Sequence, residues 1–322
     1  MTPLRSCGAL AAAFLALVCG PAVSASDLGF VAHFADLDKH QFGSTESTVV
    51  AMPSGGVGGV GEGWLSIKTT FVGNLGAQTA TVELTGDHVA SGATGVTFWM
   101  RDTGNDDNLE IHVGVGKAGG TVYLSKVGIN PPSDRWARYH VDFTNPNDWT
   151  RIKGNGNFQT ALSTSDRLLF RHDLLPLTSS PNNKMGDFGL DRVALTPCDY
   201  EVDGIDAGGS NVLALDTLAT TQIDTTHTWV GMSAPPLAQG FVLLSAVPAD
   251  LALFGGRLFV DPGLSLLLPV TSDALGVVSV PLPVPNDPAL VGGTIYGQFV
   301  ARDNAQVANW ALSNQLSATL CD

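Results

Sequence analysis

Paired carboxylates are the side chains of this sequence that could most directly cleave a glycosidic bond. Asp106 and Asp107 are adjacent in a stretch rich in Gly and Asn, and Glu110 and Asp142 fall in two expected strands. Hydrolysis needs two carboxyl groups about 5–10 Å apart across a cleft, one of them with a raised pKa. Adjacent acids among turn-forming residues more often end a hairpin. We therefore expect a non-catalytic protein and keep a hydrolase as the alternative.

Other motifs that carry catalysis are missing from the sequence. It contains no Gly-x-Ser-x-Gly nucleophile elbow, no His-Glu-x-x-His zinc motif and no cluster of His and Cys. The Gly-rich stretch Ser54–Gly63 lacks the Lys-Ser/Thr ending of a phosphate-binding loop. We assign no catalytic residue on these grounds.

A different arrangement could bind a sugar without reacting with it. Trp99 and Arg101 alternate with apolar residues, so they share one face of an expected strand. Glu110 and His112 share a face of the strand that follows. A hairpin turn through residues 102–108 would place Trp99 opposite His112. The sequence therefore predicts an aromatic ring beside hydrogen-bonding side chains on one sheet face.

Sugars are held in proteins by this combination of groups. The ring covers the apolar C–H face of the sugar, and fixed polar groups bind its hydroxyls. Tyr123 and His140 would extend the same face from neighbouring strands. The alternative is an ordinary solvated sheet face. The predicted ligand-binding residues are Trp99, Arg101, Glu110, His112, Tyr123 and His140.

Short strands would position these side chains. β-Branched and aromatic runs are separated by clusters of Gly, Asn, Asp, Ser and Pro, and no sustained helical periodicity follows the N-terminal segment. This pattern predicts an all-β chain of two β-sandwich, jelly-roll-like domains. The strands expected in the first half are Gly63–Thr70, Ala80–Leu84, Gly95–Arg101, Leu109–Val115, Thr121–Val127, Arg138–Phe143, Leu168–Arg171 and Phe188–Leu195.

The overall composition excludes two classes of protein. The 322 residues carry 16 Lys+Arg against 30 Asp+Glu, a formal charge of −14. A nucleic-acid binder is disfavoured, because phosphate contact needs clustered basic residues. Intrinsic disorder is disfavoured as well, because 44% of the residues are hydrophobic and can form a core.

The charge is divided unevenly along the chain. Residues 26–197 carry 13 Lys+Arg and 18 Asp+Glu, whereas residues 198–322 carry 12 acids with only Arg257 and Arg302 and no Lys. Different surfaces imply separate domains. We therefore predict a first domain over 26–197, a linker over 198–211 and a second domain over 212–322.

The N-terminus has the pattern of a secretory signal. Arg5 precedes an apolar stretch, and Val23-Ser24-Ala25 supplies small residues for cleavage after Ala25. The apolar stretch is too short to span a bilayer, and no later segment is long enough. Val18 precedes Cys19, which favours ordinary secretion over a lipid anchor. We expect an extracellular protein with signal segment 1–25 and no membrane span.

Removal of the signal would leave two cysteines. Cys198 stands at the predicted domain boundary, and Cys321 is the penultimate residue. An even count in a secreted chain favours a disulfide over two free thiols. A Cys198–Cys321 bond would close the second domain and stabilise it by roughly 4–5 kcal/mol in the chain-entropy model.

Several short motifs also carry a family resemblance. They are Gly63-Trp64-Leu65, Thr97–Arg101, Asp134–Tyr139 and Phe188–Leu195. With them, residues 30–196 resemble the secreted jelly-roll domains of the laminin-type domain IV and carbohydrate-binding, galactose-binding-like group. Residues 212–320 are similar to a β module that recurs in secreted proteins of environmental bacteria, through the stretches Gly293–Val300 and Ala311–Leu316.

The resemblance implies a structural calcium ion. Jelly rolls bring their two ends together, so aspartates near both ends of the first domain could supply the carboxylate oxygens that Ca²⁺ prefers. Asp199–Gly204 also starts like a calcium loop, but Ser210 stands where a bidentate Glu is needed, which favours an acidic linker. The predicted metal ligands are Asp36, Asp38, Asp187 and Asp191.

These observations together predict a secreted, non-catalytic protein that binds a glycan or the extracellular matrix. Its expected partner is a polysaccharide or a cell-surface or matrix component, and not a nucleic acid. The alternatives are a polysaccharide hydrolase that uses carboxylates of the first domain, or a structural protein of surface assemblies.

Overall fold

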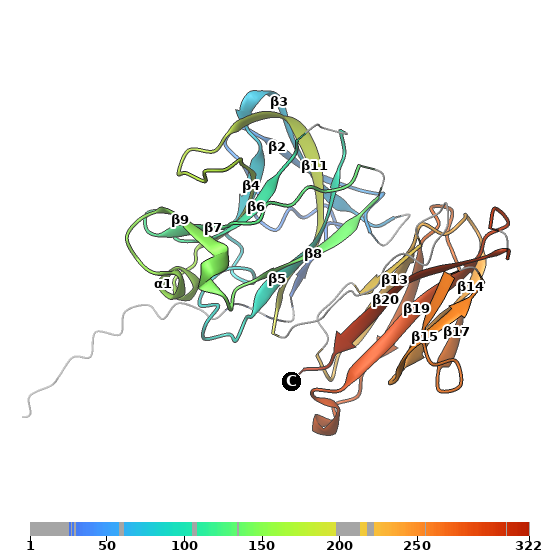
Figure 1. Cartoon of the computed structure of the whole chain (residues 1–322). Coiled ribbons are helices and arrows are strands. Elements are labelled where there is room, and N and C mark those ends of the chain that lie inside the picture. The colour runs from blue at the N-terminus through green and yellow to red at the C-terminus, as the bar shows by residue number, and fades with distance from the viewer. Residues whose placement is uncertain are drawn as a thin grey trace, which may run out of the picture.

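The computed structural model describes residues 26, 28, 30–57, 61–104, 108–133, 135–197, 213–217, 222–254, 256–306 and 308–321. Their secondary structure is almost entirely β, and Figure 1 shows it as two lobes, coloured blue to yellow-green and orange to red. The predicted all-β class is confirmed. The signal segment 1–25, the acid pair Asp106 and Asp107, and the linker 198–211 with Cys198 lie outside the described residues.

The first module, residues 30–197, is a sandwich of two antiparallel sheets. One sheet has the order β2 (Thr48–Met52), β3 (Trp64–Asn74), β11 (Asn183–Thr196), β5 (Gly95–Asp102), β8 (Ala137–Asp142), and β1 (Val31–Ala32) also pairs with β11. The other sheet has the order β4 (Gly76–Thr79), β10 (Arg167–His172), β6 (Ile111–Gly116), β7 (Val122–Ser125), β9 (Trp149–Lys153).

The core of this module lies between the two sheets. Val96, Phe98 and Met100 point into it and are fully buried, as the alternation in the sequence predicts. The ring of Phe98 meets the ring of Phe170 from the opposite sheet edge to face, with centroids 4.8 Å apart. Two short helices connect strands at the rim of the sandwich, the 3₁₀ helix η1 (Pro146–Asp148) and the α-helix α1 (Phe158–Ser163).

The predicted hairpin between residues 96–101 and 109–115 is wrong. Strand β5 pairs with β11 and β8, whereas β6 pairs with β10 and β7. The connection after Asp102 therefore crosses from one sheet to the other, and Trp99 does not lie opposite His112. The alternation of apolar residues is the same in both arrangements, so the sequence pattern cannot distinguish them.

A second expected strand is also misplaced. Residues 80–84 form a loop and turn, and the strand of this region is β4, four residues earlier. Thr81 and Thr85 form local hydrogen bonds here, from the backbone N–H of Thr81 to Thr79 Oγ1 at 3.0 Å and from Thr85 Oγ1 to Thr81 O at 2.8 Å. Local side-chain bonds of this kind compete with pairing in a sheet.

The second module begins at the described residue Leu213. It contains a three-stranded sheet, a four-stranded sheet and a hairpin. The three-stranded sheet has the order β12 (Ala214–Thr217), β13 (Thr226–Met232), β18 (Val278–Pro283). The four-stranded sheet has the order β17 (Leu266–Thr271), β14 (Gln239–Ser245), β19 (Thr294–Arg302), β20 (Trp310–Thr319). The hairpin pairs β15 (Pro248–Leu253) with β16 (Gly256–Val260). The 3₁₀ helix η2 (Pro288–Leu290) precedes β19.

Trp229 lies at the centre of the second core. It is buried together with Phe299 and Leu316. Its ring occupies the space that a Cβ on Gly297 would fill, so this close approach requires glycine on β19.

The two modules contact each other through the outer face of the six-stranded sheet. Trp64, Trp99 and Trp136 of the first module form one buried cluster with Val230 and Met232 of β13. Figure 1 shows β8 of the first lobe beside the second lobe. Within the described residues, no helix is long and apolar enough to cross a membrane.

Candidate functional site

The predicted sugar-binding residues do not lie on one face. Trp99, Arg101 and His140 belong to the six-stranded sheet, on the side away from its core. His112 lies on β6, in the five-stranded sheet, and Glu110 immediately precedes this strand. These residues reach different surfaces of the sandwich because β5 and β6 belong to opposite sheets.

The Trp99 side is covered by the second module. The side chain of Trp99 is only 1% exposed, so its ring has no free face on which a sugar could stack. The guanidinium carbon of Arg101 lies 5.0 Å from the ring centroids of both Trp64 and Trp136. Burial lowers the pKa of Arg101 from its ordinary value. Trp99 thus packs in the contact between the modules, and Arg101 packs against two tryptophans of the same cluster.

A buried ion pair also joins the first module to the second. Arg138 Nη1 donates to Asp216 Oδ1 at 2.8 Å and to Thr217 O at 2.7 Å. Burial raises the pKa of Asp216, and the positive charge of Arg138 opposes this shift. His140 follows on the same face of β8, half-buried and opposite Thr97.

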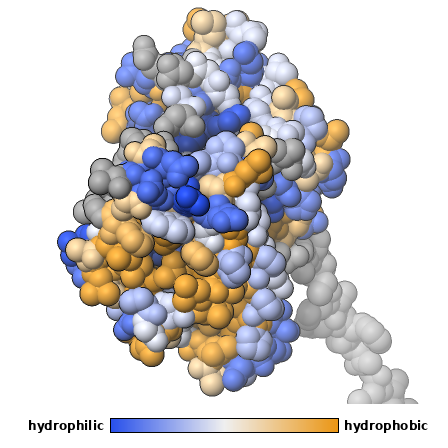
Figure 2. Space-filling view, turned by 90° about the vertical axis from the view of Figure 1, so that its right-hand side faces the viewer, coloured by the Kyte–Doolittle hydropathy of each residue, from blue (hydrophilic) through white to orange (hydrophobic). Residues whose placement is uncertain are grey.

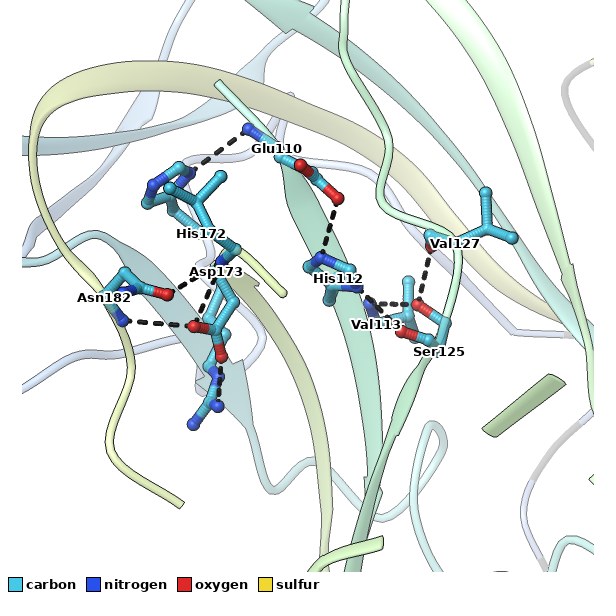
Figure 3. A network of polar contacts seen from close by, with 10 residues as sticks. Glu110, His112, Val113, Ser125, Val127, His172, Asp173 and Asn182 are labelled. Atoms are coloured by element: carbon cyan, nitrogen blue, oxygen red, sulfur yellow. Dashed lines mark hydrogen bonds and ion pairs between the residues drawn. The ribbon is translucent and has the colours of Figure 1, made fainter. Parts of the chain in front are cut away.

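Glu110 and His112 belong to a polar network rather than to an open surface (Figure 3). The imidazole of His112 is fully buried, with Nδ1 2.7 Å from Ser125 O and Nε2 3.3 Å from Glu110 Oε1. The backbone N–H of Glu110 donates to His172 Nδ1 at 3.2 Å. The predicted residue Tyr123 points into the core, where its hydroxyl donates to Gly156 O at 3.1 Å.

The four predicted metal ligands are not brought together. Strand β1 does pair with β11, so the start and end of the module meet. However, Asp36 and Asp38 lie in an exposed turn, where each accepts a hydrogen bond from the backbone N–H two residues on. Asp187 forms an ion pair with Lys68 at 3.2 Å.

The fourth predicted ligand, Asp191, is fully buried. Its carboxylate accepts hydrogen bonds from the backbone N–H groups of Val57 at 2.9 Å and Arg192 at 2.8 Å. Burial raises its pKa to about 7, and these hydrogen bonds oppose the shift only in part. In the described part of the chain, no three His, Cys, Asp or Glu side chains gather as a metal site. The structural Ca²⁺ stays a prediction, which a change in melting temperature on adding EDTA would test.

A groove that the sequence did not reveal lies at the edge of the five-stranded sheet. Its volume is about 440 Å³. Leu169 lies opposite Gln78 on β4, and Arg171 lies opposite Gly76. The groove is lined by Gly43, Ser44, Thr45, Asn74, Leu75, Gly76, Ala77, Gln78, Arg167, Leu169, Arg171 and Pro181.

Hydrogen bonds fix the polar walls of this groove. Arg171 is 8% exposed, and its Nη2 donates to Asp173 Oδ2 and, at 2.6 Å, to Thr178 O. Asp173 in turn accepts from the backbone N–H groups of Leu174 at 3.2 Å and Asn182 at 3.1 Å (Figure 3). On the opposite wall, Glu46 accepts from Asn74 N at 2.6 Å and Asn74 Nδ2 at 2.9 Å. These side chains are therefore held in place before any ligand arrives.

One sequence signal for the groove was present in β10. Arg167, Leu169 and Arg171 alternate with the buried Leu168 and Phe170, which places them on the outer face of the strand. The neighbouring strand β4 gives no such signal, because it contains Gly and Ala and has no clear alternation.

Comparisons with known proteins identify no family for this chain. No family model matches the sequence, and no curated protein matches it. Among solved structures, CtCBM11 is similar at 16% identity over 49% of this chain and 92% of its own, with a TM-score of 0.34. An exo-beta-agarase is similar at 12% identity over 73% of this chain, with a TM-score of 0.38. A beta-1,2-glucanase from Parabacteroides distasonis is similar at 11% identity over 93% of this chain, with a TM-score of 0.34.

The matches to the two enzymes cover only part of their chains, 45% of the agarase and 40% of the glucanase. All three identities are low and all three TM-scores are below 0.5, so these similarities do not identify the function of this chain.

Proposed function

We propose that this protein binds a glycan in the groove over the outer face of β4 and β10 and does not cleave it. The observation that carries the proposal is the arrangement of the groove walls. Gln78, Arg167 and Arg171 offer hydrogen-bond donors around the apolar side chain of Leu169. Sites for small ligands combine apolar surface with a few fixed polar groups in this way. A sugar residue presents both kinds of surface, with C–H groups on its faces and hydroxyls at its edges.

The carboxylates of the first module support binding over hydrolysis. The residues that line the groove include no Asp or Glu. Glu46 and Asp173 lie beside it, but each is held by the hydrogen bonds described above. In the alternative pair, Glu110 immediately precedes β6 and Asp142 ends β8, and these two strands belong to opposite sheets. Hydrolysis needs two carboxyl groups that flank the bond to be cleaved.

We propose secretion as well, from the signal pattern of residues 1–25. The ligand would then be a polysaccharide or a cell-surface or matrix component. This part of the proposal rests on the sequence, and the mass of the mature N-terminus tests it.

A glycan array followed by calorimetry tests the binding. We expect binding to at least one polysaccharide class, with no release of reducing sugar on long incubation. The double variant Gln78→Ala, Arg167→Ala should lose most of the affinity, because both side chains lie at the surface of the groove. Arg151→Ala is the matched control, since Arg151 is exposed on β9 and forms weak 3.4 Å bonds to Asn155 O and Gly156 O. Equal affinity of the double variant and the control would refute this site.

The second module favours a second function, assembly with another copy. It exposes large apolar side chains, among them Leu264, Leu266 and Leu267 at 67%, 59% and 51%. The last two belong to β17, an edge strand of the four-stranded sheet. Figure 2 shows an extended apolar region on the face turned to the viewer. Exposed apolar patches of this kind often mark interaction sites.

Sedimentation velocity tests this second function. We expect a species larger than a monomer at micromolar concentration, and a monomer for the variant Leu266→Glu, Leu267→Glu. A monomeric wild-type protein at every concentration would exclude self-assembly.

A further inference from the structure

We propose that the groove over the outer face of β4 and β10 selects a glycan that carries negative charge, as a carboxylate or a sulfate group. This inference rests on the proposed function and adds the class of ligand. The charged residues that line the groove are Arg167 and Arg171, in a chain whose formal charge is −14.

The two arginines differ in what they can offer to a ligand. Arg171 is almost buried, and its Nη2 is already bound to Asp173 and Thr178. The positive charge of Arg171 is therefore largely neutralised by the Asp173 carboxylate. Arg171 therefore forms a fixed part of the groove wall.

Arg167 keeps its charge available. Among the residues that the structure describes, its side chain has one polar contact, an ion pair from Nε to Asp166 Oδ1 at 3.4 Å, which is weak by distance. Asp166 is an exposed side chain, and the same Oδ1 accepts a shorter bond of 2.8 Å from the backbone N–H of Ala118. The two terminal nitrogens of Arg167 make no other hydrogen bond within the described residues and can bind a ligand.

The chemistry of guanidinium explains the preference for an anion. Its planar fork of donors binds two oxygens of a carboxylate or a sulfate at once, which a neutral hydroxyl cannot match. Leu169 lies between the two arginines on the same face of β10, so an apolar side chain separates the two basic ones along the groove. At about 3.3 Å per residue, Arg167 and Arg171 are roughly 13 Å apart along the strand. This is long enough for the ligand to be an oligosaccharide rather than a single sugar.

Charges of both signs lie near this end of β10. Burial lowers the pKa of His172, the residue after Arg171, and the positive charge of Lys184 lowers it further, whereas the carboxylates of Asp173 and Glu110 oppose this shift. The carboxylates in the neighbourhood, Glu46, Asp166 and Asp173, are each engaged by a backbone N–H.

The test uses pairs of polymers that differ only in charge. Oligogalacturonides are compared with their methyl esters for the carboxylate, and dextran sulfate is compared with dextran for the sulfate. The full protein is titrated with each at low salt by calorimetry. We expect the charged member of at least one pair to bind about tenfold more tightly or better, as one charge-assisted bidentate contact provides. The pair that shows the difference identifies the anion.

The variant Arg167→Gln should remove this preference while unfolding at the same temperature as the wild type. Arg151→Gln, at an exposed position on β9, should keep it. Equal binding of charged and neutral polymers by the wild type would refute the anionic ligand and leave glycan binding in place. Absence of binding to both members of every pair, and to the whole glycan array, would refute the proposed function itself.

Discussion

The buried carboxyl group of Asp191 should make the stability of the protein fall as the pH rises. Burial raises its pKa in the folded state to about 7, whereas the ordinary value is 3.8. The folded protein therefore binds a proton that the unfolded chain has already released, and ionisation at higher pH costs stability. At about 1.36 kcal/mol per pH unit, the free energy of unfolding should fall by roughly 3 kcal/mol between pH 5 and pH 8.

The variant Asp191→Asn isolates this contribution. The amide keeps the size of the carboxyl group and does not ionise, but it can accept only one of the two bonds from Val57 N and Arg192 N. Loss of one hydrogen bond should cost about 1 kcal/mol at every pH. The charged groups nearest to Asp191 are Arg192 and Glu62, which pair with each other at 2.8 Å and are unchanged in the variant.

Urea unfolding at pH 5, 6, 7 and 8, followed by tryptophan fluorescence, measures the effect. Trp64, Trp99 and Trp136 lie in the cluster that Val57 joins, so their emission reports on this region. We expect the variant to gain roughly 3 kcal/mol relative to the wild type between pH 5 and pH 8. The control is Asp148→Asn, an exposed carboxyl group in η1. Parallel stability curves for wild type and Asp191→Asn would show that Asp191 does not titrate in this range, and the reasoning from burial would be wrong.

Three further predictions concern two buried groups and the cysteines. Arg138→Met should destabilise the protein by about 3–5 kcal/mol, because it leaves the carboxylate of Asp216 buried without its partner. In urea unfolding, the double variant Arg138→Met, Asp216→Leu should recover much of this loss, and an equal loss of stability in the single and double variants would contradict the coupling between Arg138 and Asp216. Burial lowers the pKa of His88 to about 4, so stability present above pH 6.5 should fall by roughly 3 kcal/mol as the pH falls toward 4. His88→Gln should remove this dependence of the free energy of unfolding on pH. An unchanged pH dependence of stability in the variant would assign the effect to other groups. The mature protein, unfolded without reductant, should show no reactive thiol, whereas two reactive thiols would refute the predicted Cys198–Cys321 bond.

Local patterns in the sequence predicted much of the fold. The alternation around Phe98 assigned inward and outward faces correctly, because successive side chains in a strand point to opposite sides. The Gly-rich and Asn-rich stretches predicted short strands joined by turns. The same patterns could not show which strands pair, so the hairpin between β5 and β6 was expected where the chain crosses between sheets.

The sequence by itself thus determined the all-β class and the side of the strand on which Trp99 lies. Tertiary structure alone decided that the second module covers Trp99, that Asp191 is buried, and that segments from residues 43 to 181 meet in one groove. The physical reason is the range of the interactions. Alternation in a strand follows from the covalent geometry of neighbouring residues, whereas burial and the walls of a groove depend on contacts between residues far apart in the chain, which no local pattern records.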